Sequence, residues 1–246
     1  MIGAESPALW LDGWLAVIVR EQWCPVSPAP SLQPPSPQQS IVTLDLEGVL
    51  VPEIWIAVAE RTGIDELRRT TRDEPDYDVL MKGRLALLDE HRLTMGLIAE
   101  VIAGLAPMDG ALAFLGELRT RTQVVILSDT FEQFAAPLMR QLDMPTILCH
   151  QLVVDNDKIV DYALRMPDQK RNAVEAFRSL NYRVVAAGDS YNDQSMLAAA
   201  DTGFWFHAPE AIIAEFPEFA ATDTYDELLD CITDSLVPPR DQTVRK

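Results

Sequence analysis

Short apolar runs alternate with helical patterns along most of the chain after residue 40. The apolar runs are rich in Val, Ile and Leu, and each stops at polar or glycine residues, as strands buried in a parallel sheet do. They lie at residues 41–46, 124–129, 146–154, 182–189 and 203–206. Patterns with helical spacing separate them, at residues 110–122, 131–143, 170–180 and 194–201. This alternation predicts an α/β fold with a doubly wound parallel sheet.

One long segment interrupts the alternation directly after the first strand. Helical patterns fill residues 54–63, 77–91 and 95–105, with Thr94 placed as an N-cap, and no strand pattern occurs among them. We therefore predict a small helical cap, residues 55–105, inserted into a core made of residues 41–54 and 106–234. A polar tail, residues 235–246, follows the last helical pattern.

The first forty residues are predicted to lie outside this core. The apolar run at residues 9–19 is too short to span a bilayer, contains Asp12, and is not preceded by the basic residues of a secretory signal. Six of residues 25–37 are proline, which excludes a regular helix or strand there. We expect residues 1–40 to be a poorly ordered extension, either without function or carrying a short amphipathic docking helix.

The charge of the chain limits the partners that it can bind, and its cysteine content indicates the compartment. The 246-residue chain has 38 acidic and 20 basic residues, a net charge of −18, which disfavours binding to nucleic acid or to a membrane surface. An anionic small substrate would need local bases or a cation. The three cysteines, Cys24, Cys149 and Cys231, are widely spaced and odd in number, as expected of reduced thiols in a cytoplasmic protein.

Polar side chains end three of the predicted strands. Asp45 ends the first, Ser128 and Asp129 end the second, and Asp189 ends the third. Because ligands of open α/β sheets bind at the carboxyl ends of the strands, these residues should share one cleft. A single acid there could simply be solvated, but three coincident strand ends favour a functional site.

The predicted cleft has the donors of a magnesium site. Carboxylates that converge repel each other unless a cation lies among them, and oxygen donors without histidine or cysteine favour Mg²⁺. Asp193, just after the third strand, adds another carboxylate, although it could instead cap the following helix. Lys170, at a helix start beside Arg171, is the candidate to neutralise a phosphoryl group. The three histidines show no ligand spacing, and we expect them to be structural or exposed: His91, His150 and His207.

Four motifs in order give the chain a family resemblance. The segments DLEGVLV (45–51), LSDT (127–130), a downstream lysine and GDSYND (188–193) resemble the motifs of the haloacid dehalogenase-like phosphatases. The glutamate within DLEGVLV, followed by PEIW, together with PDYDVLMKGRL (75–85), is more similar to the bifunctional phosphoserine phosphatase/homoserine phosphotransferase family. The resemblance covers residues 41–233, with the helical insertion in the place of that superfamily's cap.

The resemblance implies a role for each matching residue. Asp45 would be the nucleophile that forms an aspartyl-phosphate, and Glu47 the general acid and base. By the same resemblance, Mg²⁺ would bind to Asp45, Asp189, Asp193 and the backbone carbonyl of Glu47, and the phosphoryl group to Ser128, Asp129 and Lys170. The substrate amine would meet Glu53 and its carboxylate Arg84. A carboxylate for the amine and a forked guanidinium for the carboxylate fit phosphoserine.

Glu47 departs from the aspartate that most phosphatases of the superfamily carry at this place. One extra methylene moves the carboxylate by about an ångström, and such a misplacement can cost on the order of 10²-fold in rate. Slower attack by water would leave time for another hydroxyl to accept the phosphoryl group. This is our hypothesis for transfer to L-homoserine.

The strand-end site predicts Mg²⁺-dependent phosphoryl transfer, and the resemblance implies that the substrate is O-phospho-L-serine and that phosphate is also transferred to L-homoserine. One alternative is a phosphatase of the same superfamily for another small phosphomonoester. The other is a non-catalytic protein that binds a phosphometabolite, although a sensor has no need of the Asp45 and Glu47 pair. The sequence leaves the oligomeric state open, a homodimer included.

Overall fold

The structure is a computed structural model, and it describes residues 39–71, 73–74 and 76–236. The predictions for residues 1–38 and for the tail from residue 237 onward lie outside the described residues.

A seven-stranded sheet forms the centre of the described region, with the strand order β4-β3-β2-β1-β5-β6-β7. The strands are β1 (Gln39–Leu44), β2 (Gln123–Phe131), β3 (Thr146–Asp155), β4 (Lys158–Ala163), β5 (Tyr182–Gly188), β6 (Thr202–Phe206) and β7 (Ala220–Thr222). All neighbouring pairs are parallel except β3 and β4, which form an antiparallel hairpin. The predicted α/β class with a doubly wound sheet is confirmed. The three-residue β7 was not predicted, and β1 begins at Gln39 rather than at residue 41.

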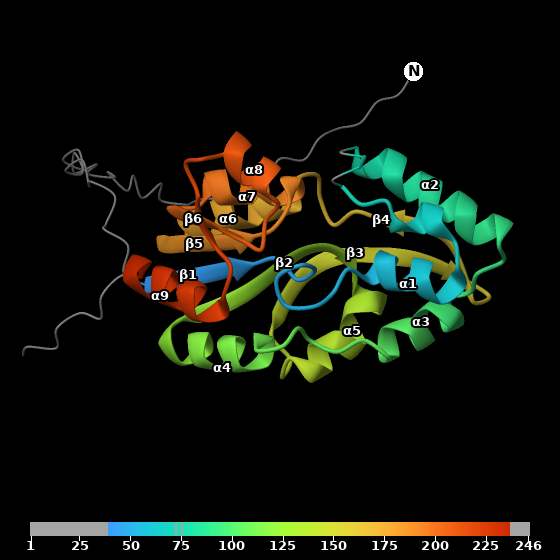
Figure 1. The fold of residues 1–246 in the computed structure, drawn as a ribbon, viewed down its shortest axis with the longest axis horizontal. Coiled ribbons are helices and arrows are strands. Elements are labelled where there is room, and N and C mark those ends of the chain that lie inside the picture. The colour runs from blue at the N-terminus through green and yellow to red at the C-terminus, as the bar shows by residue number, and fades with distance from the viewer. Residues whose placement is uncertain (1–38, 72, 75, 237–246) are drawn as a thin grey trace, which may run out of the picture. The chain divides into compact units, whose positions relative to one another are not determined.

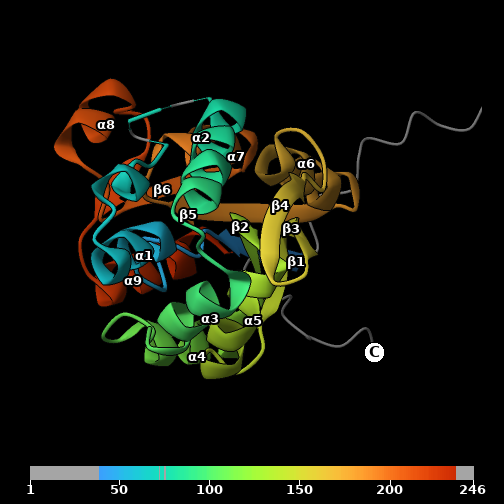
Figure 2. The same ribbon diagram turned by 90° about the vertical axis from the view of Figure 1, so that its right-hand side faces the viewer.

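Helices cover both faces of the sheet (Figures 1 and 2). They are α1 (Ile54–Thr62), α2 (Tyr77–Glu90), α3 (Met95–Ala103), α4 (Ala111–Arg121), α5 (Glu132–Gln141), α6 (Gln169–Ser179), α7 (Gln194–Ala199), α8 (Glu210–Glu215) and α9 (Tyr225–Ser235). Short 3-10 turns occur at Asp65–Arg68 and Tyr191–Asp193. Helices α4, α5 and α9 pack on one face, and α6 and α7 on the other. This two-sided cover explains why β1, β2 and β5 each contain a run of buried, mostly apolar residues with no polar face turned to solvent.

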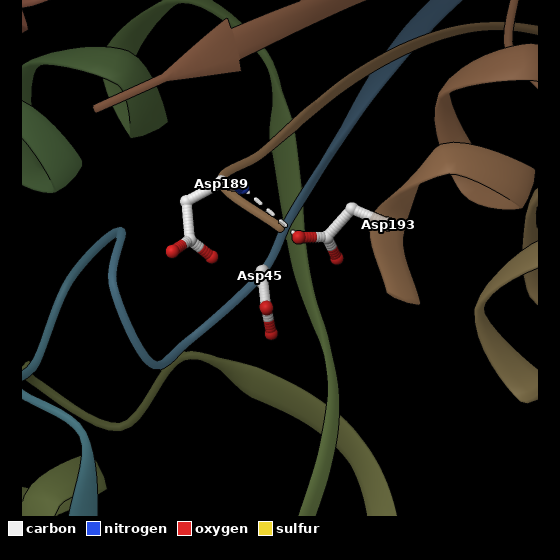
Figure 3. Close-up of side chains that lie close together, drawn as sticks. All are labelled: Asp45, Asp189 and Asp193. Atoms are coloured by element: carbon white, nitrogen blue, oxygen red, sulfur yellow. Dashed lines mark hydrogen bonds between the residues drawn. The ribbon is translucent and has the colours of Figure 1, made fainter. Parts of the chain in front are cut away.

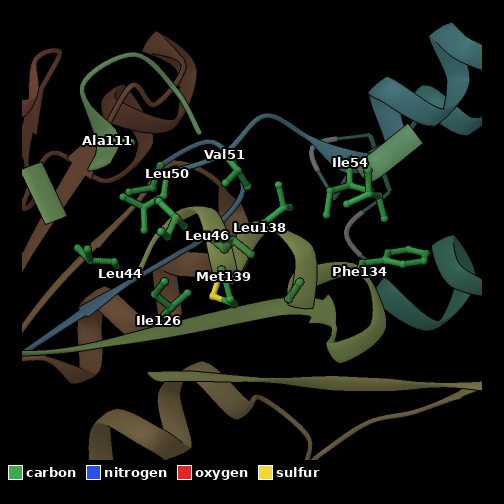
Figure 4. Close-up of a cluster of buried hydrophobic side chains, with 14 of the residues drawn as sticks. Leu44, Leu46, Leu50, Val51, Ile54, Ala111, Ile126, Phe134, Leu138 and Met139 are labelled. Carbon is green, nitrogen blue, oxygen red and sulfur yellow. The ribbon is translucent and has the colours of Figure 1, made fainter. Parts of the chain in front are cut away.

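The core on the α5 face extends from the sheet into the inserted helices. Leu44 of β1 and Ile126 of β2 pack with Leu138 and Met139 of α5, and Figure 4 shows Phe134 and Ile54 in the same cluster. These side chains are fully or almost fully buried. The first strand is therefore held between its neighbours and a helix, which fixes the place where it ends.

The segment between β1 and α4 is helical, and the described part of it contains no strand, as predicted. Gly63 ends α1 with a φ of 72°, a left-handed conformation that glycine adopts without strain. The Thr94 side chain accepts a hydrogen bond from Leu97 N at 3.2 Å, so its predicted N-cap role is confirmed. Helix α2 lies on β4 and α3 on α5. Within the described residues, every helix is too short or too polar to cross a membrane.

Candidate active site

Three adjacent strands end at one pocket. β1 lies between β2 and β5, so Asp45 after β1, Ser128 near the end of β2 and Asp189 after β5 meet at the same edge of the sheet. All three line a single pocket, and all three are buried. Figure 3 shows the carboxylates of Asp45 and Asp189 side by side, with Asp193 projecting toward them from the segment after β5. The structure thus brings Asp45, Ser128 and Asp189 together at one edge of the sheet, as their positions after the predicted strands indicated.

Two glycines leave the space that these acids occupy. A Cβ atom on Gly48 would lie 2.3 Å from Asp189 Oδ2, and the φ of 77° at Gly48 is itself unfavourable for other residues. A Cβ on Gly188 would lie 2.3 Å from Asp193 Cγ. The glycines inside DLEGVLV and GDSYND therefore permit the carboxylates to approach one another.

The ammonium group of Lys170 lies among the acids. Its Nζ atom is 2.9 Å from Asp45 Oδ2, 2.7 Å from Asp193 Oδ1 and 3.8 Å from Asp129 Oδ2. Burial alone would lower the pKa of Lys170, but Asp193, Asp45 and Asp129 hold it well above its usual value. The neighbouring Arg171 is exposed and pairs with Glu175 instead. Lys170 is thus a permanent cation inside the pocket wall.

Asp193 supports the site and does not cap α7, although its bond from Ser190 N belongs to a capping box at the 3-10 turn Tyr191–Asp193. Its Oδ1 atom accepts from Lys170, and its Oδ2 atom accepts from the backbone N–H groups of Asp189 and Ser190 at 2.9 and 3.1 Å. Its side chain makes no capping bond to α7, the alternative that the sequence left open. Both oxygens are engaged, so Asp193 fixes Lys170 and the Asp189 backbone.

The donor set fits a divalent cation. Among the described residues, Asp45, Asp189 and Asp193 form the group of acids whose oxygens lie within 4.8 Å of one another. The pKa of Asp45 is well above its usual value because of burial and the nearby Asp193 and Asp189, although Lys170 opposes the shift. An oxygen-rich site with surplus negative charge fits Mg²⁺, and a bound ion would relieve the repulsion around Asp45.

Glu47 lies between the acids and the inserted helices. Its Oε2 atom accepts from Ile54 N, the first residue of α1, at 2.9 Å. Burial and then the negative charge of Glu53 raise its pKa to about 7, against the effects of the Ile54 bond, Thr130 and Arg84. A carboxyl group with a pKa near neutrality can both give and take a proton, which suits a general acid and base.

The two residues predicted to bind an amino acid lie at the same pocket. Glu53 lines it just before α1, and Arg84 lines it from α2. The Arg84 guanidinium stacks 4.6 Å over Trp55 and donates to the Arg69 carbonyl at 2.8 Å, while its buried Nε has no hydrogen-bond partner among the described residues. Burial lowers the pKa of Arg84 to about 10, which leaves it charged at neutral pH. The pocket therefore has acids at the sheet edge, with Lys170 beside them, and has Glu53 and Arg84 on the segment between β1 and α4.

Asp129 is the centre of a network that the sequence did not reveal. Its carboxylate accepts from Gln169 Nε2 at 3.1 Å and from Asn192 Nδ2 at 3.0 Å, and His150 Nε2 lies 3.4 Å away. Burial raises its pKa, but Lys170 and these hydrogen bonds outweigh that effect and hold the pKa below its usual value. Asp129 is thus an ionised, fixed part of the pocket wall.

The three histidines were predicted to be structural or exposed, and the structure agrees: His91 and His207 are exposed, and His150 is buried. His150 nevertheless contacts a site residue, and Tyr77, which sequence reasoning passed over, donates from its hydroxyl to the Asp129 carbonyl. The available signal for His150 was position, because β3 runs parallel beside β2 and sets His150 opposite Phe131, three residues after Ser128.

Comparison with known proteins assigns the family. A family model described as haloacid dehalogenase-like hydrolase matches residues 40–201, which include Asp45, Ser128, Lys170 and the acids after β5. The chain belongs to this hydrolase family. The resemblance noted in the four motifs is thereby confirmed.

Relatives of this hydrolase carry a narrower description. "Phosphoserine phosphatase ThrH" of Pseudomonas aeruginosa is 64% identical over 189 residues, which are 76% of this chain and 92% of the relative. "Phosphoserine phosphatase" of Pseudomonas syringae pv. tomato is 62% identical over 189 residues, 76% of this chain and 80% of the relative. A solved structure of a "phospho-aspartyl intermediate analogue of phosphoserine phosphatase" aligns with a TM-score of 0.68 at 20% identity, over 79% of this chain and 99% of that one. The last similarity supports the fold.

Magnesium binding by this hydrolase is testable without turnover. A ligand at about 100 times its Kd stabilises a protein by roughly 2.7 kcal/mol, so saturating Mg²⁺ should raise the midpoint of thermal unfolding of the wild type. Asp189→Asn should lose most of that rise, because it removes one of the three carboxylates that could bind the ion. The matched control is Asp230→Asn on an exposed part of α9, which should keep the wild-type rise. An equal rise in both variants would contradict a metal site at Asp189.

Proposed function

We propose that the chain is a Mg²⁺-dependent phosphoserine phosphatase that works through an aspartyl-phosphate and also transfers phosphate to L-homoserine. One observation carries the proposal: Glu53 and Arg84 line the same pocket as Asp45. A phosphate at the sheet and an amino acid at the inserted helices are the two ends of phosphoserine. The identity of 62–64% to relatives named phosphoserine phosphatase supports the same assignment.

The first half-reaction uses Asp45 as the nucleophile. The Leu46 N–H donates to Asp45 Oδ1 at 2.7 Å and Lys170 holds Oδ2, so the carboxylate has a fixed orientation before substrate arrives. An Asp45 oxygen attacks phosphorus, the bond from phosphorus to the serine Oγ breaks, and Glu47 gives its proton to that oxygen. Serine leaves, and the phosphoryl group remains on Asp45.

The second half-reaction reverses the role of Glu47. The Glu47 carboxylate takes a proton from water or from the homoserine hydroxyl, and the oxygen attacks phosphorus while the bond to Asp45 breaks. Phosphate or phosphohomoserine leaves, and the Asp45 carboxylate is restored. One residue thus serves both halves, as its pKa of about 7 allows.

Charge on the transferring group is balanced by fixed partners. Lys170 lies 2.9 Å from Asp45 and so faces the oxygens of the phosphoryl group, and Ser128 offers its buried hydroxyl at the same edge. A magnesium ion held by Asp45, Asp189 and the Glu47 carbonyl, with Asp193 behind them, would supply further positive charge to these oxygens when bound.

The decisive assay is turnover of phosphoserine with and without homoserine. The purified chain with Mg²⁺ should release serine and phosphate, and with homoserine present it should also form phosphohomoserine, each measured by chromatography. Formation of serine and phosphate without phosphohomoserine would support the phosphatase activity and contradict transfer to homoserine. No turnover of phosphoserine would contradict the substrate and direct the search to other phosphomonoesters.

The hypothesis that Glu47 favours transfer is tested by Glu47→Asp in the same assay. The shorter side chain should draw the carboxylate back toward the strand, speed hydrolysis, and lower the ratio of phosphohomoserine to phosphate, by up to about 10²-fold if the full positional effect applies. An unchanged ratio of phosphohomoserine to phosphate would contradict the hypothesis that Glu47 favours transfer.

Arg84→Lys tests the amino-acid end of the pocket. Lysine keeps the charge but cannot form the forked pair with a carboxylate, so kcat/KM for phosphoserine should fall by roughly tenfold or more, mainly through KM. The rate with p-nitrophenyl phosphate, which has no carboxylate, should change little. Equal losses for both substrates would contradict a carboxylate contact at Arg84.

A further inference from the structure

Tyr77 joins the inserted helices to the phosphate end of the pocket. It is the first residue of α2, and its hydroxyl donates to the backbone carbonyl of Asp129 at 2.7 Å. Asp129 directly follows Ser128, so the bond is made to the segment that holds the phosphoryl group. Tyr77 also lines the pocket.

The acceptor of this bond is rigid. Gln169, Asn192 and His150 surround the Asp129 carboxylate, and the three come from three different elements of the core. His150 Nδ1 accepts from the backbone N–H of Arg165 at 3.1 Å, so its ring proton is on Nε2, facing Asp129. These contacts hold the Asp129 side chain, and Asp129 is itself part of β2, so its backbone carbonyl has a fixed place beside Tyr77.

The ring of Tyr77 adds packing to the hydrogen bond. It lies 5.8 Å from the His150 ring and 6.1 Å, edge to face, from the Tyr162 ring. Other links between α2 and the β3–β4 hairpin are exposed: Lys158 pairs with Asp89, and the Tyr162 hydroxyl with Asp78. Exposed ion pairs contribute little, so Tyr77 is the stronger contact at the pocket end of the helix.

The same helix carries the residue that would hold the amino acid. Arg84 follows Tyr77 by seven positions, which places both on one face of α2, and both line the pocket. The bond from Tyr77 to Asp129 therefore fixes the distance between Arg84 and the phosphoryl site.

We propose that the Tyr77–Asp129 hydrogen bond is a latch that sets how the phosphoryl group on Asp45 divides between an amino-acid hydroxyl and water. The inference rests on the proposed function. An amino acid can accept only while α2 holds Arg84 over the site, whereas water needs no contact with α2. Weakening the latch lowers the population of the amino-acid-binding arrangement and so favours hydrolysis.

Serine itself provides the acceptor for the test. In the reverse of the first half-reaction the serine Oγ attacks phosphorus, its proton goes to Glu47, and the bond to Asp45 breaks, which re-forms phosphoserine. Labelled serine added to unlabelled phosphoserine is thus incorporated into phosphoserine each time an amino acid, rather than water, takes the group. The ratio of labelled phosphoserine to released phosphate measures the division directly.

The variant is Tyr77→Phe, which keeps the ring and removes only the hydroxyl. The ratio should fall roughly threefold to tenfold, the equivalent of one hydrogen bond, while phosphate release continues and shows the variant to be folded. Thr122→Val is the matched control: it removes a hydroxyl that donates to the Ser40 carbonyl at 2.8 Å, at the opposite edge of the sheet. Its ratio should equal that of the wild type.

Each other result is informative. An unchanged ratio in Tyr77→Phe, or an equal fall in Thr122→Val, would overturn the latch while the phosphatase stands. Phosphate release by the wild type without any incorporation of labelled serine would also overturn the latch, because the phosphoryl group would then pass to water alone. Failure of the wild type to act on phosphoserine would instead overturn the proposed function, and the latch with it.

Discussion

The contact of Lys170 with Asp45 and Asp193, both within 3 Å, is the interaction on which the site depends. Buried carboxylates from separate strands repel one another, and an ammonium group among them makes their approach tolerable. Asp193 in turn holds the backbone of Asp189. One lysine at the start of α6 thus ties together the ends of β1 and β5, and a metal ion would complete the balance.

The pocket separates two tasks between two parts of the chain. In the proposed function the sheet supplies the nucleophile and the charges for a phosphoryl group, and the segment between β1 and α4 supplies Arg84 and Glu53, which line the same pocket. Glu47 lies where the two meet and bonds to the first residue of α1. If Glu47 is the general acid, as proposed, its bond to the start of α1 links the position of the inserted helices to the chemistry as well as to binding.

The parts of the site that depend on local pattern could be predicted from the sequence. Strand ends locate Asp45, Ser128 and Asp189, because parallel strands bring their carboxyl ends to one edge. Lys170 could not be told from Arg171 by pattern alone; the packing of α6 buries one and exposes the other. Tyr77 and His150 depend on contacts across about 50 and 20 residues of sequence, with Asp129 as the shared neighbour, and no local pattern marks such contacts. The strand β7 is too short to leave a periodic signal.

Trapping of the covalent intermediate tests the central claim most directly. The chain is mixed with ³²P-labelled phosphoserine and Mg²⁺, quenched in acid within one turnover, digested, and the labelled peptide identified by mass spectrometry. We predict an alkali-labile acyl phosphate on Asp45, absent from Asp45→Asn, which should also release no serine. Label on another residue, or serine release by Asp45→Asn at the wild-type rate, would contradict the assignment of Asp45 as the nucleophile.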